Sequence, residues 1–118
     1  MKILVIDNEK SFAESFGQYL KSTANAEITL ANTVKQALNL INQNCYDLII
    51  TEVSLPDAEN ENWLMKIDNI NPGQKLIILT SHLFPCNLSL SEKLNIIGYF
   101  EKPFDANIIL NLINQLTN

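Results

Sequence analysis

Five short apolar runs, separated by segments with the periodicity of helices, constrain the fold of this chain more than any other feature. Runs of this length suit buried strands rather than helices. Their alternation with helical segments is typical of an α/β fold in which helices cover both faces of a parallel sheet. The predicted strands are residues 2–7, 27–31, 47–52, 75–80 and 98–101.

The segments between the runs place apolar residues three or four positions apart, which is the spacing of one helix face. We expect a helix between consecutive strands and a last one after the fifth strand. Asp105 is a good N-cap for that last helix, and Asn71, Pro72 and Gly73 end the third. The apolar positions are Phe12, Phe16 and Leu20, then Val34, Ala37, Leu38 and Ile41, then Trp63, Leu64 and Ile67, then Leu88, Leu90 and Leu94, and finally Ile108, Ile109, Leu112, Ile113 and Leu116.

Composition limits both the number of domains and the class of partner. A chain of 118 residues that is 47% hydrophobic and 18% charged is expected to form one globular domain, residues 1–118. Its formal charge of -5 argues against direct binding to nucleic acid or to an anionic membrane, because both normally require a basic patch. A protein partner or a small cation suits it better.

Targeting signals and cysteine spacing favour a cytoplasmic protein. The opening MKILVIDNEK has too short an apolar stretch for a signal peptide, and no run is long enough for a membrane span. Cys45 and Cys86 are too few for a disulfide framework and have no zinc-type spacing, so we interpret them as reduced thiols.

Polar residues end four of the five runs, and this pattern carries most of the functional information. Parallel strands place their carboxyl ends along one edge of the sheet, so these residues are expected to meet in one crevice. A buried carboxylate at Glu52 would need a counter-ion, and Lys102 is the candidate. Asp7 and Asn8 are also ordinary helix-capping residues, so a purely structural cluster is the alternative. The residues expected in the crevice are Asp7, Asn8, Glu52, Thr80 and Lys102.

Four segments, ILVIDNE, YDLIITEVSLPD, LIILTS and GYFEKPF, together resemble the receiver domain of two-component response regulators. The resemblance spans essentially the whole chain and keeps the family's spacing from Thr80 through Tyr99 to Lys102. It implies a flavodoxin-like, doubly wound parallel sheet of five strands in the order 2-1-3-4-5, with five helices. It also implies a signalling module rather than an enzyme, in which a central aspartate receives a phosphoryl group from a histidine kinase.

The family's metal and acceptor positions can be matched to this sequence by motif. The two acidic positions that hold magnesium fall on Asp7 and Asn8, and the acceptor position falls on Glu52. The backbone carbonyl of Ser54 would complete the metal shell. The resemblance therefore implies magnesium as cofactor, with Asp7, Glu52 and Ser54 as ligands.

The remaining family positions concern a hydroxyl, a lysine and a switch residue. The hydroxyl position falls on Thr80 and the lysine position on Lys102, whose peptide bond to Pro103 is often cis in the family. Tyr99 matches the aromatic residue that turns inward on activation.

Two of these positions depart from the family pattern, and both touch the chemistry. Asn8 offers a neutral amide oxygen, whereas magnesium prefers charged oxygens, so its affinity is expected to fall. Glu52 carries the acceptor carboxyl one methylene further, or about 1.5 Å. Since a misplacement of about 1 Å can cost on the order of a hundredfold in rate, efficient phosphorylation at Glu52 is not expected.

The sequence therefore favours a pseudo-receiver, a protein-interaction module that works without phosphorylation. Its partner-binding face would comprise the fourth helix, the fifth strand and the fifth helix, and family members commonly form homodimers through this face. Two alternatives stay open. One is a working acceptor that uses Glu52, Asp7 or Asp57, and the other is a small-ligand binder that uses the same crevice.

A few further residues are interpreted structurally. Trp63 is expected to pack in or beside the core, and His82 to be a loop residue because no second His supports it as a ligand. Asn60 stands where the family often has glycine, and Asn tolerates a left-handed turn. Pro85 lies early in the fourth helical segment, so that helix is expected to start late or to be short.

Overall fold

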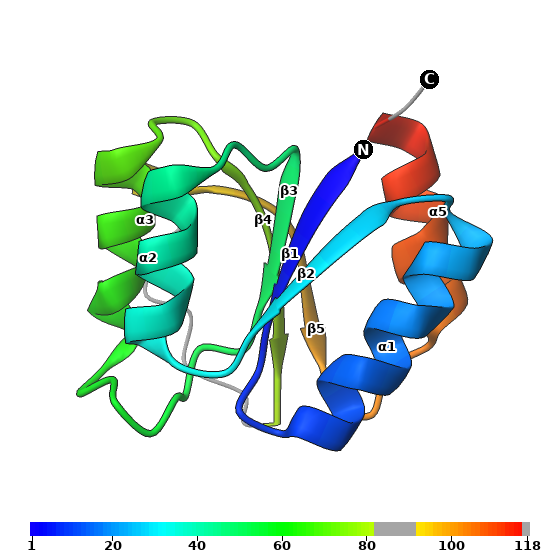
Figure 1. Ribbon diagram of the computed structural model, residues 1–118, viewed down its shortest axis with the longest axis horizontal. Helices are drawn as coiled ribbons and strands as arrows, with labels where there is room; N and C mark the ends of the chain where they lie inside the picture. Colours follow the sequence, from blue (N-terminus) through cyan, green and yellow to red (C-terminus); the bar gives the residue numbers. More distant parts are fainter. Residues whose placement is uncertain (82–91, 117–118) are drawn as a thin grey trace.

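The computed structural model describes residues 1–81 and 92–116, which form a parallel sheet between two layers of helices (Figure 1). The strand order β2-β1-β3-β4-β5 confirms the predicted order 2-1-3-4-5. Every pairing is parallel, so the carboxyl ends of the strands share the lower edge of the sheet in Figure 1. The strands are β1 (Lys2–Ile6), β2 (Glu27–Ala31), β3 (Leu48–Thr51), β4 (Lys75–Thr80) and β5 (Asn95–Glu101).

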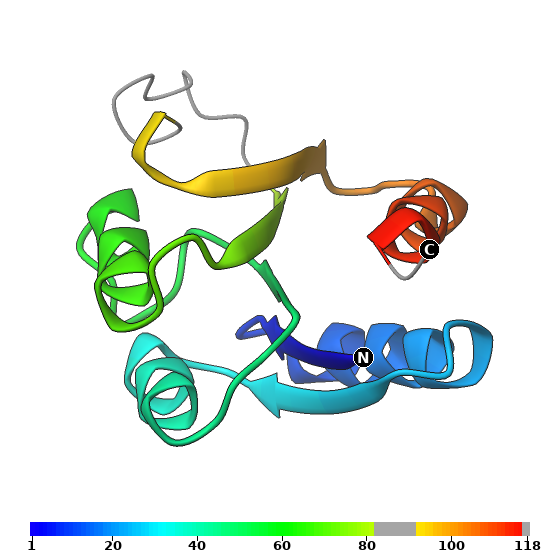
Figure 2. The same cartoon turned by 90° about the horizontal axis from the view of Figure 1, so that it is seen from above.

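Within the described residues there are four α-helices and one short 3-10 helix. Helices α1 and α5 cover one face of the sheet, and α2 and α3 cover the other (Figure 2). None of these helices is long and apolar enough to cross a membrane. The predicted fourth helix, around Leu88, Leu90 and Leu94, lies largely outside the described residues, so four of the five predicted helices are confirmed. The helices are α1 (Lys10–Thr23), α2 (Val34–Gln43), η1 (Glu61–Trp63), α3 (Leu64–Ile70) and α5 (Ala106–Leu116).

The core consists of two apolar layers, one on each face of the sheet. Along β1, Leu4 and Ile6 pack toward α2 and α3, whereas Ile3 and Val5 pack toward α1 and α5. Because helices cover both faces, the inner strands β1, β3 and β4 have continuous apolar runs at their centres, and polar residues occur only at their ends. Each fully buried Leu, Ile or Val side chain contributes roughly 1.5–3 kcal/mol of transfer free energy, which makes these strands the rigid base of the crevice.

Polar side chains cap the helices and define where they begin. The Asp105 carboxylate accepts a hydrogen bond from the Asn107 amide at 2.9 Å, which confirms the predicted N-cap of α5. Thr33 caps α2 in the same way. The interpretation of Asn60 as a left-handed turn residue is wrong, because its backbone is extended at φ -161° and its side chain accepts from the Asn62 amide to cap η1.

Strand β5 begins at Asn95, earlier than the predicted start at residue 98. Ile96 and Gly98 pair with consecutive residues of β4, so Ile97 is an extra residue that forms a β-bulge. The bulge breaks the alternation of faces, and Gly98 has no side chain that would reveal its face. Because of these two features, residues 95–97 lack the alternating pattern of a strand and could not be predicted as part of it.

Candidate functional site

The predicted crevice forms at the carboxyl edge of the sheet. Asp7 follows β1, Glu52 follows β3, Thr80 ends β4 and Lys102 follows β5. Asp7, Glu52 and Thr80 are buried, with exposed fractions of 2%, 3% and 0%. The Lys102 ammonium lies within 4 Å of both carboxylates, so the structure brings together side chains that are far apart in the sequence.

Backbone hydrogen bonds extend the sheet to the crevice residues themselves. The Glu52 amide donates to the Ile6 carbonyl at 2.9 Å, and the Lys102 amide donates to the Thr80 carbonyl at 2.7 Å. The Asp7 amide donates to the next strand in the same manner. These bonds fix the backbone positions of the three charged residues, so the geometry of the site depends mainly on the conformations of their side chains.

The two oxygens of Glu52 are held by backbone amides from two loops. Oε2 accepts hydrogen bonds from the amides of Val53 at 2.7 Å and Ser54 at 3.3 Å. Oε1 accepts from the Ser81 amide at 3.2 Å and from the Ser81 hydroxyl at 3.4 Å. The longer side chain therefore folds back into a cradle of N–H groups at the strand ends, which is an arrangement that favours a negative charge.

The ammonium of Lys102 divides its contacts unequally between the two carboxylates. Nζ lies 2.5 Å from Asp7 Oδ2 but 3.8 Å from Glu52 Oε1. The expected ion pair between Lys102 and Glu52 is therefore present, and the structure adds a second and closer pair with Asp7. The physical reason is that the amide cradle holds the Glu52 carboxylate and makes it less dependent on the ammonium.

Sequence reasoning missed Ser81 and Phe12 as members of the site. Ser81 contributes mainly its backbone N–H, which any residue except proline would supply, so its identity carries little signal. Phe12 was interpreted only as an apolar helix position, but its ring lies under the Lys102 ammonium with Nζ 4.4 Å from the ring centroid. The sequence offers one indication of this role: Phe12 and Phe16 are four residues apart near the start of the helix that follows β1, so their rings share the helix face near the end of that strand.

The donor atoms of the crevice do not fit a magnesium ion as they are arranged. Asp7 Oδ1 accepts from the Glu9 amide at 2.9 Å, Asp7 Oδ2 binds Lys102, and both Glu52 oxygens are engaged by amides. Asn8 is exposed and offers only a neutral oxygen. Over residues 1–81 and 92–116, no three His, Cys, Asp or Glu side chains gather into a group that could hold a metal. The implied ligand set of Asp7, Glu52 and Ser54 would require these hydrogen bonds and the ion pair to rearrange, and it stays a prediction.

The proposed switch residue lies on the edge strand. Tyr99 pairs with Ile78 of β4 and has an exposed fraction of 40%. The peptide bond between Lys102 and Pro103 is cis, as predicted. Tyr99 is thus an exposed residue of the edge strand β5.

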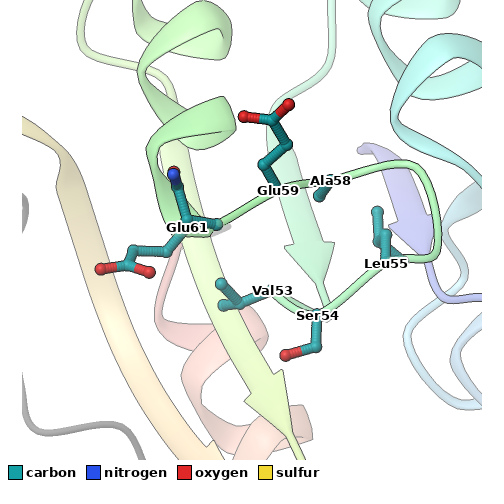
Figure 3. A pocket seen from close by; sticks show the side chains of 7 residues that line it. Val53, Ser54, Leu55, Ala58, Glu59 and Glu61 are labelled. Carbon is teal, nitrogen blue, oxygen red and sulfur yellow. The ribbon is translucent and has the colours of Figure 1, made fainter.

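The loop after β3 encloses a small cavity of about 240 Å³ (Figure 3). The carboxylates of Glu59 and Glu61 point away from one another in this view, so they do not converge on a cation. Trp63, which is buried as predicted, donates from Nε1 to the Val53 carbonyl at 2.9 Å and ties the loop to α3. His82 lies outside the described residues. The cavity is lined by Val53, Ser54, Leu55, Ala58, Glu59, Asn60 and Glu61.

Asp57, an alternative acceptor, caps helix α2 from this loop. Its Oδ1 accepts from the Val34 amide at 2.9 Å and its Oδ2 from the Lys35 amide at 3.1 Å. The hydrogen bond from Val34 lowers the pKa of Asp57 below its ordinary value of 3.8, although desolvation opposes this effect. Both oxygens of Asp57 are thus committed to a helix N-terminus.

We expect Asp57→Ala to lower stability at neutral pH by about 1 kcal/mol, the usual cost of losing a helix cap. Because the folded-state pKa of Asp57 is lowered, its stabilisation is present above the ordinary pKa and is lost as pH falls through the folded value. Melting temperatures measured from neutral to acidic pH should therefore converge for wild type and variant. Glu59→Ala is the exposed control. A gap that persists below the folded pKa would contradict the capping role.

A comparison with known protein families matches almost the whole chain. The model of the response regulator receiver domain family matches residues 3–114. The chain belongs to this family. The fold and its strand order are therefore those of a receiver domain of two-component signalling.

Relatives of this receiver occur in longer proteins. It is 28% identical to the probable transcriptional regulator ycf29 of Pyropia yezoensis over 98% of this chain and 52% of that protein. It is 29% identical to the sensory transduction protein LytR of Staphylococcus epidermidis over 98% of this chain and 46% of that protein. The chain thus spans about half the length of these curated relatives.

Solved receiver structures share the fold closely. A CheY-like receiver domain protein from Methanospirillum hungatei superposes with a TM-score of 0.87 at 26% identity, covering 98% of this chain and 93% of that one. The response regulator TrrA of Thermotoga maritima, solved in complex with Mg(2+)-BeF, gives a TM-score of 0.83 at 24% identity, covering 98% and 97%. The second likeness shows the fold alone.

Proposed function

We propose that this receiver is a pseudo-receiver, a protein-interaction module that works without phosphorylation. The observation that carries the proposal is the state of Glu52, whose two carboxylate oxygens accept hydrogen bonds from three backbone amides and one hydroxyl. The acceptor position is thus filled by a carboxylate that is already satisfied. An acceptor must instead present a free oxygen to the incoming phosphorus.

The hydrogen bonds of Glu52 oppose phosphorylation in a second way. To attack a donor, an oxygen of Glu52 would have to leave amides that each stabilise it, and a hydrogen bond to a charged group is worth roughly 1.5–3 kcal/mol. This cost adds to the misplacement of the carboxyl by its extra methylene. Both effects favour an acceptor position that remains unmodified.

The same contacts support a permanently held signalling state. Glu52 binds Ser81, which directly follows β4 and begins the connection toward the partner-binding face. A phosphoryl group brings about -1.5 to -2 charge and three acceptor oxygens, whereas Glu52 brings about -1 and two. Glu52 therefore attracts the Ser81 loop after β4 as a phosphoryl group would, but less strongly, and it does so without any modification.

The proposed partner-binding face lies on β5 and α5, together with the fourth helical segment. Tyr99 on β5 and Ile108 on α5 are the large apolar side chains exposed among the described residues, with exposed fractions of 40% and 52%. An apolar protein surface, including that of a second copy, would cover them. In the alternative of a working acceptor, a histidine kinase would be the partner.

Calorimetry with magnesium and beryllofluoride tests this proposal, because that mimic binds only where a phosphoryl group fits. We expect no binding heat for the wild-type chain. The Thermotoga maritima receiver TrrA, whose structure holds Mg(2+)-BeF, is the positive control. Strong binding linked between the two ligands would show a working acceptor site and would end the pseudo-receiver proposal.

A small-ligand function is the second candidate, and one observation favours it. A cavity of about 560 Å³ lies between α1 and the loop before α5, where Phe12, Phe16 and Phe104 line it beside Lys102. Cavities of this size and apolar character accept small molecules. Calorimetric binding of a metabolite without magnesium, abolished by Phe12→Ala, would favour this candidate.

A further inference from the structure

We infer that the Lys102 ammonium is the built-in cation of this receiver, and that it excludes a divalent ion from the crevice. The inference deepens the proposed function, since both rest on a crevice whose charges are satisfied internally. It makes a separate statement, however. It assigns the loss of metal binding to Lys102 as well as to Asn8, and it predicts that removal of the ammonium will create a divalent-cation site.

The position of the ammonium is the first support. Nζ lies 2.5 Å from Asp7 Oδ2 and 3.8 Å from Glu52 Oε1, and thus bridges the two buried carboxylates. Magnesium would need to approach these same oxygens to about 2.0–2.1 Å. The ammonium and a divalent ion therefore compete for the same atoms and repel one another at this distance.

The ring of Phe12 is a second contact that positions the ammonium. Nζ lies 4.4 Å from the centroid of the Phe12 ring, which stacks on Phe16 with centroids 5.6 Å apart. Phe104 meets both rings edge-on, at 5.9 and 5.4 Å. A ring face attracts a cation, and the packed cluster fixes that face. Lys102 is thus positioned by an aromatic support, not only by the charge of its partners.

The charge balance explains why removing the ammonium should matter. Asp7 and Glu52 bring two negative charges, Lys102 brings one positive charge, and Asn8 brings none. The two carboxylates are 2% and 3% exposed, and Lys102 is the cation that the described residues place within 4 Å of both, so its removal would leave two buried negative charges without this counter-ion. A small divalent cation would restore the balance.

Thermal unfolding in magnesium chloride and in EDTA tests this inference without reference to phosphorylation. Lys102→Met removes the charge but keeps an apolar stem over Phe12, and Lys102→Arg keeps the charge. We expect magnesium to raise the melting temperature of Lys102→Met by about 4 °C or more near saturation, and to leave wild type and Lys102→Arg almost unchanged. Lys75→Met, an exposed lysine at the opposite edge of the sheet, is the matched control.

Manganese locates the ion and keeps the inference testable if Lys102→Met does not fold. Paramagnetic broadening of amide signals at Asp7 and Glu52 should appear in Lys102→Met or Lys102→Gln and disappear when Asp7→Asn is added. Broadening at Asp7 in wild type at the same manganese concentration would overturn the inference, as would a Lys102 variant that folds and shows none. Neither result would touch the pseudo-receiver proposal, which depends on beryllofluoride binding.

Discussion

The double variant Asn8→Asp, Glu52→Asp is expected to take up phosphoryl groups from acetyl phosphate in magnesium on the order of a hundredfold faster than wild type. Asp at position 52 would carry its carboxyl about 1.5 Å nearer the backbone than Glu52 does, so we expect it to leave part of the cradle to the transferred oxygens. Asp at position 8 adds a charged oxygen for magnesium beside Asp7. The two changes therefore restore position and charge together.

Intact-protein mass spectrometry measures this gain as a mass increase that hydroxylamine removes, as expected for an acyl phosphate. The single variants Asn8→Asp and Glu52→Asp separate the contribution of charge from that of position. Peptide mapping should place the group at position 52, and Asp57→Asn in the double variant should leave labelling intact. Ready labelling of the wild-type chain, or labelling of Asp7 or Asp57, would contradict the proposed role of Glu52.

Trp63→Ala is expected to destabilise the fold by about 3–5 kcal/mol, the usual cost of removing a large buried aromatic ring. Trp63 is 5% exposed and packs in the layer between the sheet and α2 and α3. Its Nε1 also donates to the backbone carbonyl of Val53, and the backbone N–H of Val53 donates to Glu52. Loss of Trp63 should therefore weaken both the core and the loop that forms the cradle.

Urea unfolding measures this change, and Trp63→Phe is the matched control. Phe keeps most of the ring volume but cannot donate to Val53, so it should lose the hydrogen bond, worth about 1 kcal/mol, together with a smaller packing term. If Trp63→Ala cost no more than Trp63→Phe, the ring would not be a core element. The loop would then depend on the hydrogen bond alone.

The positions of most strands and helices could be predicted because they depend on local patterns. The central residues of the inner strands β1, β3 and β4 are buried on both faces, so they form continuous apolar runs in the sequence as well. Strand β5 was located only in part, since the bulge at Ile97 and the bare Gly98 interrupt the pattern. The bulge arises from the pairing of β5 with β4, and a pattern within β5 alone gives no information about that pairing.

The strand pattern of the sequence predicts which charged side chains meet. Asp7, Glu52 and Lys102 each follow an apolar strand, and parallel connection of those strands leaves their ends on one edge. The unequal contacts of Lys102, which lies closer to Asp7 than to Glu52, could not be predicted and depend on the folded chain. The physical reason is that Glu52 is held by backbone amides of two separate loops. Every residue type except proline has a backbone N–H group, so the convergence of these donors cannot be read from residue identities.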